Sequence, residues 1–187
     1  MTIDFHAHPV PDAFRKWLPL LDIDVIVNDG FPLPQWSKEA HLRFMDDAGI
    51  DYTVLSLPTP HIHRGDDEKS LQAAMEINDE LASLKSDRFG WTACLLASMG
   101  MMETVDARAE FEKLYFDIAG DPEPVALDML RMVAADDHIV FGSDFPHSPA
   151  NVILMKKAHF DGNPRWDGIR ERIYSGNGFR AGQALIR

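Results

Sequence analysis

Two histidines one residue apart, His6 and His8, are the first residues whose types and spacing could do chemistry. They end an apolar run that begins at Ile3, and Pro9 follows them directly. Side chains in a β-strand alternate between faces, so residues i and i+2 point the same way, and the proline ends the strand. Neutral imidazole nitrogens suit zinc and similar ions, so this pair predicts half of a metal site. A pair of hydrogen-bonded histidines at a strand end is the alternative interpretation.

A carboxylate far downstream could complete such a site. The stretch from Ile139 to Pro146 repeats the plan of the first one, with an apolar strand that ends at Asp144. A set of two histidines and one aspartate binds a divalent ion and leaves positions open for water and substrate. An aspartate beside that water can also accept a proton, so we predict that Asp144 is both a metal ligand and a catalytic residue. A side-chain bond to its own turn backbone is the alternative role.

Three further residues, Trp36, His61 and His147, are candidates for substrate binding. Trp36 lies in a proline-rich aromatic loop, where core packing is the alternative. His61 and His63 form a second pair with the same spacing, but they follow prolines in a loop, where strand alternation is not guaranteed. A surface or substrate-facing loop is therefore favoured there over a second metal site. His147 comes three residues after Asp144 and either lines the pocket or lies exposed in a turn.

The apolar pattern predicts the elements that must position these residues. Strands alternate with helices, which indicates parallel β-α units whose ligands gather at the carboxyl ends of the strands. Asp117 also falls at such an end and either faces the site or bonds to neighbouring backbone. A short accessory strand is expected from Asp22 to Val27, and a methionine-rich patch with a short charged helix at 97–113. The core strands are expected at 3–8, 52–57, 89–95, 114–118 and 139–142, and the helices at 11–18, 37–48, 68–85, 124–134, 152–160 and 166–174.

Composition limits the classes of function. The chain has 187 residues and a formal net charge of −12, which argues against nucleic acid and anionic membrane surfaces as partners. Cys94 is the only cysteine, so an internal disulfide is excluded and a reducing compartment is favoured. The sequence contains neither a signal-peptide pattern nor an apolar stretch long enough to span a membrane. We therefore expect a cytoplasmic protein that has no membrane contact.

Several stretches together resemble the amidohydrolase superfamily, and more narrowly its amidohydrolase-related group, which contains aminocarboxymuconate-semialdehyde decarboxylase. The stretches that carry the resemblance lie at 4–8, 49–52, 88–90, 114–117, 142–146 and 173–177. The resemblance implies a (β/α)8 TIM barrel that binds a divalent metal, most often zinc, with His6 and His8 as ligands from strand one and Asp144 as the ligand from strand eight. It also implies a metal-dependent hydrolase or non-oxidative decarboxylase that acts on a small carboxylated substrate.

The chain departs from that family in its middle. Family members use further histidines at the ends of strands five and six, but no histidine lies between His63 and His138. About five of the eight core strands are recognisable, so we predict one incomplete domain over 1–187 that is internally shortened near 96–109. Five parallel strands cannot close an eight-stranded barrel. The open edges could be covered in a homo-oligomer, remain an open sheet, or reflect an internal deletion. The alternative function is a catalytically impaired remnant that acts as an interaction subunit.

Overall fold

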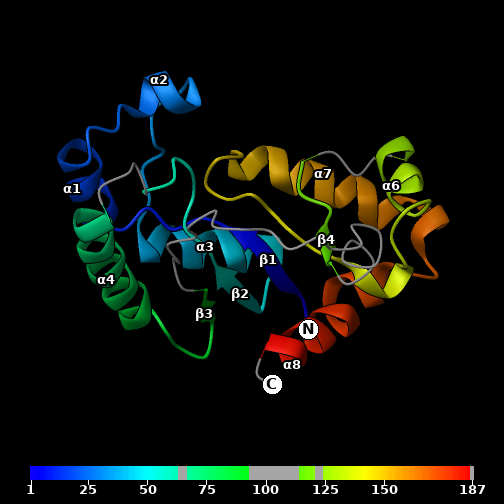
Figure 1. The fold of residues 1–187 in the computed structure, drawn as a ribbon. Helices are drawn as coiled ribbons and strands as arrows, with labels where there is room; N and C mark the ends of the chain where they lie inside the picture. The colour runs from blue at the N-terminus through cyan, green and yellow to red at the C-terminus, as the bar shows by residue number, and fades with distance from the viewer. Residues whose placement is uncertain (63–66, 93–113, 121–123, 186–187) are drawn as a thin grey trace, which may run out of the picture.

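Five short parallel strands form the centre of the molecule (Figure 1). The computed structural model describes residues 1–187 with gaps at 63–66, 93–113, 121–123 and 186–187. One sheet has the order β1-β2-β3, and β4 pairs with β5 in a second sheet. The strands are β1 (Ile3–Ala7), β2 (Tyr52–Leu55), β3 (Phe89–Trp91), β4 (Phe116–Asp117) and β5 (Ile139–Val140).

Backbone hydrogen bonds join the two sheets side by side. The Phe5 N–H donates to the Phe141 carbonyl at 2.9 Å, and the His8 N–H donates to the Phe145 carbonyl at 2.8 Å. A parallel bridge also links Ala7 to Phe145. The described strands therefore follow the order β4–β5–β1–β2–β3, and their carboxyl ends share one edge.

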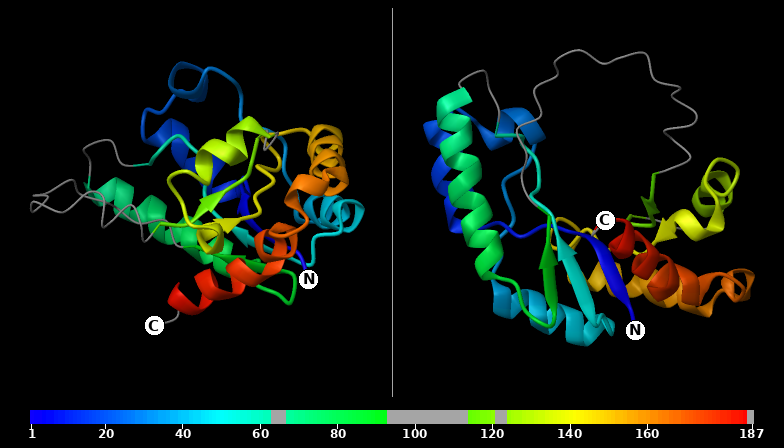
Figure 2. Two further views of the ribbon diagram at one scale, coloured as in Figure 1. Left: turned by 90° about the vertical axis from the view of Figure 1, so that its right-hand side faces the viewer. Right: turned by 60° about the horizontal axis from the view of Figure 1, so that its bottom comes forward.

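Helices flank these strands (Figure 2). Helix α4 packs beside α1 near the β3 side, whereas α7 and α8 lie toward the β5 side. One apolar cluster fills the space between the strands, α3 and α7, and a second one joins α1 to α4. The helices are α1 (Asp12–Leu20), α2 (Val25–Asp29), α3 (Lys38–Ala48), α4 (Asp67–Ser83), α6 (Val125–Leu130), α7 (Ala150–Gly162) and α8 (Asn177–Leu185), with short turns η1 (Asp136–His138), η2 (Pro164–Trp166) and η3 (Arg172–Gly176).

The α/β architecture agrees with the sequence prediction, and α3 is capped at both ends. The Ser37 hydroxyl accepts a hydrogen bond from the Ala40 N–H at 3.1 Å and so caps the first turn. Gly49 follows the last turn with φ of +65°, the left-handed conformation that favours glycine. These two residues fix where α3 begins and ends, and hence which of its side chains face the sheet.

The prediction of an accessory strand from Asp22 to Val27 was wrong. The structure has a turn at Asp22 and then the short helix α2. The Asp24 carboxylate accepts a hydrogen bond from the Val27 N–H at 3.1 Å, which is the bond of an N-cap residue. A capping aspartate therefore decides the local conformation against the β-branched residues that follow it.

Other boundaries differ in smaller ways. Helix α1 continues through Pro19 to Leu20, because a proline in the last turn removes only one intrahelical hydrogen bond. In place of the helix expected at 166–174, the structure has the 3-10 turn η2 and the π-helix η3. The expected features at 97–113, including the shortening near 96–109, lie outside the described residues. Among the described helices, none is long and apolar enough to cross a membrane.

Candidate metal centre

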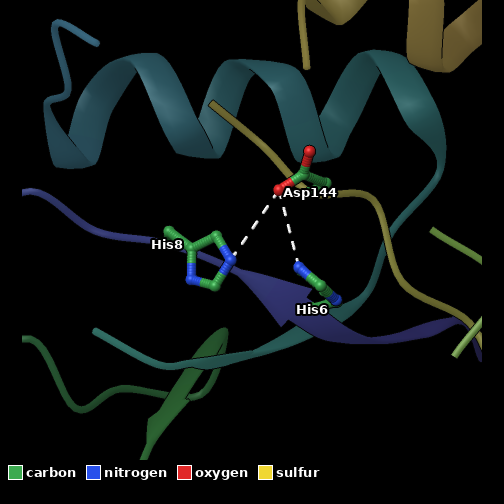
Figure 3. Close-up of side chains that lie close together, drawn as sticks. All are labelled: His6, His8 and Asp144. Atoms are coloured by element: carbon green, nitrogen blue, oxygen red, sulfur yellow. Dashed lines mark ion pairs between the residues drawn. The ribbon is translucent and has the colours of Figure 1, made fainter. Parts of the chain in front are cut away.

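His6, His8 and Asp144 converge at the carboxyl end of the strands (Figure 3). The two histidines extend from the same face of the chain at the end of β1, and the loop after β5 brings Asp144 opposite them. The Asp144 Oδ1 atom lies 3.5 Å from His6 Nε2 and 3.7 Å from His8 Nε2. One ligand atom from each residue lies within 4.8 Å of the others. The structure thus brings together all three residues that we predicted as metal ligands.

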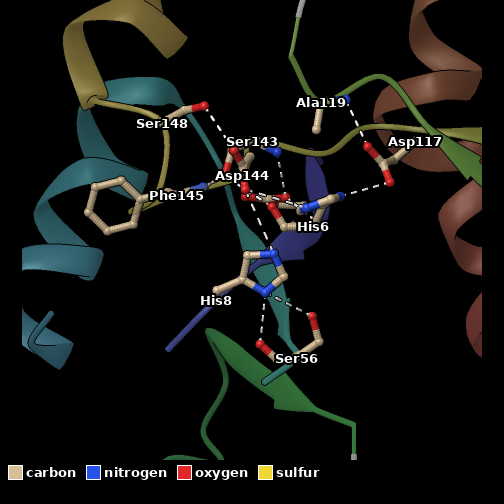
Figure 4. A network of polar contacts seen from close by, with 10 residues as sticks. His6, His8, Ser56, Asp117, Ala119, Ser143, Asp144, Phe145 and Ser148 are labelled. Atoms are coloured by element: carbon tan, nitrogen blue, oxygen red, sulfur yellow. Dashed lines mark hydrogen bonds and ion pairs between the residues drawn. The ribbon is translucent and has the colours of Figure 1, made fainter. Parts of the chain in front are cut away.

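The second nitrogen of each imidazole is held by a different strand end (Figure 4). His6 Nδ1 lies 2.9 Å from Asp117 Oδ2, and His8 Nδ1 lies 3.0 Å from the carbonyl oxygen of Ser56. An acceptor at Nδ1 places a ring hydrogen there, so that in the neutral ring Nε2 is the electron-pair donor. Histidines that bind metals almost always have such a carboxylate or carbonyl partner.

Asp117 serves both of the roles that the sequence left open. Its Oδ2 atom contacts His6, while its Oδ1 atom accepts a hydrogen bond from the Ala119 N–H at 2.8 Å. The carboxylate thereby fixes the loop after β4 and the orientation of the His6 ring at the same time.

Asp144 has an uncommon backbone conformation, with φ of +62°. A non-glycine residue rarely adopts this left-handed region, and its neighbours must favour it. The Asp144 N–H donates to the His6 carbonyl at 2.6 Å, and the Ser148 hydroxyl donates to Asp144 Oδ2 at 2.9 Å. The side chain does not bond to its own turn backbone, and its Oδ1 atom is directed toward the two histidines.

A buried carboxylate, Asp4, joins the two segments that carry the site. It has no exposed surface, and its Oδ1 atom accepts hydrogen bonds of 3.0 Å from the backbone N–H groups of His6 and Ser143. Burial raises the pKa of Asp4 to about 7. The sequence analysis assigned Asp4 no role of its own, although a charged residue inside an apolar strand is a usable signal.

The charges of the cluster follow from these contacts. The hydrogen bonds to Asp117 and then Asp144 raise the pKa of His6 to about 10 in the metal-free protein. Burial lowers the pKa of His8, which therefore stays neutral. Burial alone would raise the pKa values of Asp117 and Asp144, but the neighbouring His6 lowers both. Both carboxylates are therefore ionised, and the site offers negative charge to a cation.

The donor set fits a divalent ion. Donor atoms about 2.1 Å from a tetrahedral zinc ion lie roughly 3.4 Å apart. The Asp144 Oδ1 atom lies 3.5 Å from His6 Nε2 and 3.7 Å from His8 Nε2, which is close to that spacing. Two nitrogens and one oxygen are also the ligand types of catalytic zinc sites that keep a position open.

The three candidate substrate residues lie in different surroundings. The His147 ring packs edge-on against His8, with 5.4 Å between ring centroids, and contacts Phe31 on its other side at 5.8 Å. Trp36 is half-buried and packs against the second apolar cluster, and its indole N–H donates to His41 Nδ1 at 3.0 Å. His61 is exposed, and the described residues include no hydrogen bond or ion pair between it and the three ligands.

His41 is a buried histidine that the sequence analysis missed. It lies on α3 with no exposed surface, and burial lowers its pKa to about 3. The signal was present, because His41 shares a helical spacing with the buried residues Phe44, Met45 and Ala48.

Comparisons with known proteins support the amidohydrolase resemblance, although no family model matches the sequence. A curated protein, 6-methylsalicylic acid decarboxylase from Penicillium expansum, is 46% identical over 52 residues, which are 28% of this chain and 15% of that protein. A crystal structure described as an amidohydrolase II superposes with a TM-score of 0.81 at 17% sequence identity. That superposition covers 96% of this chain and 99% of the other. The chain therefore has the fold of a protein described as an amidohydrolase II and is similar in sequence, over a short stretch, to 6-methylsalicylic acid decarboxylase.

Proposed function

We propose that this chain is a metal-dependent hydrolase or non-oxidative decarboxylase that acts on a small carboxylated substrate. The observation that carries the proposal is the convergence of His6, His8 and Asp144, with the outer nitrogen of each histidine held by Asp117 or Ser56. Zinc is the ion that this ligand set favours. The similarity to 6-methylsalicylic acid decarboxylase favours decarboxylation over hydrolysis.

We also propose that residues 1–187 form a single amidohydrolase-related domain of the (β/α)8 type with part of its barrel missing. The order β4–β5–β1–β2–β3 supports this, because it corresponds to five consecutive positions around a closed parallel barrel. A homo-oligomer is one way to cover the remaining strand edges. The cytoplasmic location stays a prediction from composition.

The roles of the residues follow from their chemistry. His6 and His8 would hold the ion, together with one oxygen of Asp144. When bound, a divalent ion polarises a substrate oxygen or lowers the pKa of a water molecule. Decarboxylation replaces a carbon–carboxylate bond with a carbon–hydrogen bond, so it requires one proton at that carbon. Asp144 is ionised and would take this proton from a substrate hydroxyl or water and deliver it, while Ser148 fixes its second oxygen.

The walls of the site would orient the substrate. We assign substrate contacts to His147, which lies beside His8, and to the half-buried Trp36. For the exposed His61, a place in a substrate-facing loop stays a prediction from the sequence. The pair formed by His147 and Phe31 offers an aromatic edge against which a flat carboxylated substrate could lie.

The test is turnover by the full chain loaded with zinc. Small hydroxylated benzoic acids and muconic acids are supplied, and carbon dioxide release and substrate absorbance are followed. We expect turnover in the wild type and a loss of about 10²-fold or more in Asp144→Asn, the range for a general acid–base residue. Stoichiometric zinc without turnover on any of these acids would contradict the proposal and agree with a catalytically impaired remnant.

A further inference from the structure

His41 lies outside the metal centre but in contact with the segment that carries Asp144. Its Nδ1 atom accepts the hydrogen bond from the Trp36 indole at 3.0 Å. An indole nitrogen can only donate, so Nδ1 has no hydrogen and the neutral ring carries it on Nε2. The Nε2 atom is buried and has no hydrogen-bond partner among the described residues. Trp36 therefore determines the tautomer and the orientation of a ring that makes no other hydrogen bond within the part of the chain that the structure describes.

The His41 ring is surrounded by aromatic side chains. Its centroid lies 4.8 Å from that of Phe145 and 5.1 Å from that of Phe89, both in edge-on geometry. Phe145 in turn stacks on Phe44 at 4.2 Å with an interplanar angle of 5°. His41 and Phe44 are three residues apart on α3, so they lie on one face of this helix, and both side chains pack against the Phe145 ring.

Phe145 is the residue directly after Asp144, and its backbone makes hydrogen bonds in addition to the contacts of its ring. The Phe145 carbonyl accepts the His8 N–H at 2.8 Å, and the Phe145 N–H donates to the Ser143 hydroxyl at 3.1 Å. Asp144 therefore lies between anchored neighbours. Its left-handed conformation is costly for a non-glycine residue and persists only when such neighbours determine it.

We propose that His41 is a positioning residue, which Trp36 orients and which holds Phe145 so that the Asp144 carboxylate faces His6 and His8. The proposal rests on the proposed function in one respect, the role of Asp144 as a ligand. It gives the loop before α3 a second task, because that loop carries both Trp36 and Phe31, which contacts His147. The loop before α3 and the segment that carries Asp144 are thus linked through one part-buried hydrogen bond, between Trp36 and His41.

The test is Trp36→Phe in the full chain, which removes the indole N–H that donates to His41 but keeps an aromatic ring at position 36. We expect zinc affinity, measured by competition with a chromogenic chelator, to fall about tenfold, as for other residues that orient ligands. We also expect the ring-nitrogen chemical shifts of His6 and His8 in the metal-free ¹⁵N-labelled protein to move, because Asp144 lies opposite both. A second variant, His41→Asn, keeps an acceptor two bonds from Cβ but removes the ring, and we expect the same two changes.

Trp166→Phe is the matched control. Trp166 is fully buried, whereas Trp36 is half-buried, and the Trp166 indole nitrogen has no hydrogen-bond partner in the described part of the chain. We expect this variant to leave zinc affinity within twofold and the His6 and His8 shifts unchanged. Unchanged affinity and unchanged shifts in folded Trp36→Phe and His41→Asn would overturn the proposal. A wild-type chain that binds no zinc would count against the proposed function, whereas the shifts still test His41.

Discussion

Replacing Asp117 by asparagine should weaken zinc binding although Asp117 is not itself one of the three ligands. Its two carboxylate oxygens have separate tasks, since Oδ2 lies 2.9 Å from His6 Nδ1 and Oδ1 accepts the Ala119 N–H at 2.8 Å. An asparagine has one acceptor oxygen and an NH₂ group that can only donate. It can therefore serve either His6 or Ala119, and its NH₂ group then faces an N–H at the other contact.

The magnitude follows from this loss. His6 would lose a charge-assisted hydrogen bond that fixes its tautomer and raises the basicity of Nε2. Losing such an outer partner typically lowers metal affinity by about 10- to 100-fold. Since each factor of ten corresponds to about 1.4 kcal/mol, the expected cost is roughly 1.4 to 2.8 kcal/mol of binding free energy.

The assay is zinc competition with a chromogenic chelator on wild type and Asp117→Asn at one pH. Asp167→Asn is the matched control, because Asp167 is 66% exposed and forms an ion pair with Arg170 on the surface. We expect the control to bind zinc as the wild type does. An Asp117→Asn affinity within twofold of wild type, in a folded protein, would refute the assigned role of the His6–Asp117 contact.

Two further predictions concern stability. Burial lowers the pKa of His41 to about 3 in the folded protein, whereas the side chain of the unfolded chain has a pKa of about 6.5. Between these two pH values only the unfolded state takes up a proton, so the free energy of unfolding falls as the pH falls. Between pH 7 and pH 5, wild type should lose about 2 kcal/mol more unfolding free energy than His41→Phe, as measured by urea denaturation; equal losses would contradict this. At Gly142 a Cβ would lie 2.6 Å from the His6 Cβ and 2.9 Å from Asp117 Oδ1, so Gly142→Ala should lower both thermal stability and zinc affinity. Gly162→Ala, where nothing lies within 4 Å of the added Cβ, is the control and should do neither.

The three proposed ligands could be found from sequence because their placement depends on local rules. Strand alternation puts His6 and His8 on one face, and an apolar strand followed by a turn puts Asp144 at the same edge. The prediction needed only that the two strands be parallel neighbours. The hydrogen bonds between β1 and the segment after β5 supply that adjacency.

The supporting residues could not be assigned because their roles depend on contacts between distant parts of the chain. Asp117 is 111 residues from His6, and no local pattern shows which of two partners its carboxylate meets. The role of Asp4 likewise depends on Ser143, 139 residues away. His41 could have been recognised as buried from its helical spacing, but its hydrogen bond to Trp36 follows only from how the loop before α3 folds.

The wrong strand at Asp22 to Val27 has a local cause. Its β-branched residues favour a strand, but Asp24 caps a helical turn at Val27, and the five-residue helix α2 forms there instead. Propensity is a weak guide where a segment is short and has no neighbouring strand to pair with.

Metal content tests the central claim most directly. The full-length wild type and a His6→Ala/His8→Ala variant are loaded with zinc, desalted and measured by inductively coupled plasma mass spectrometry against protein concentration. We predict one zinc ion per chain in the wild type and none above background in the folded variant, because the variant keeps only the Asp144 oxygen of the ligand set. A wild type without stoichiometric zinc, or a variant that retains it, would contradict the assignment of His6, His8 and Asp144 as a metal centre.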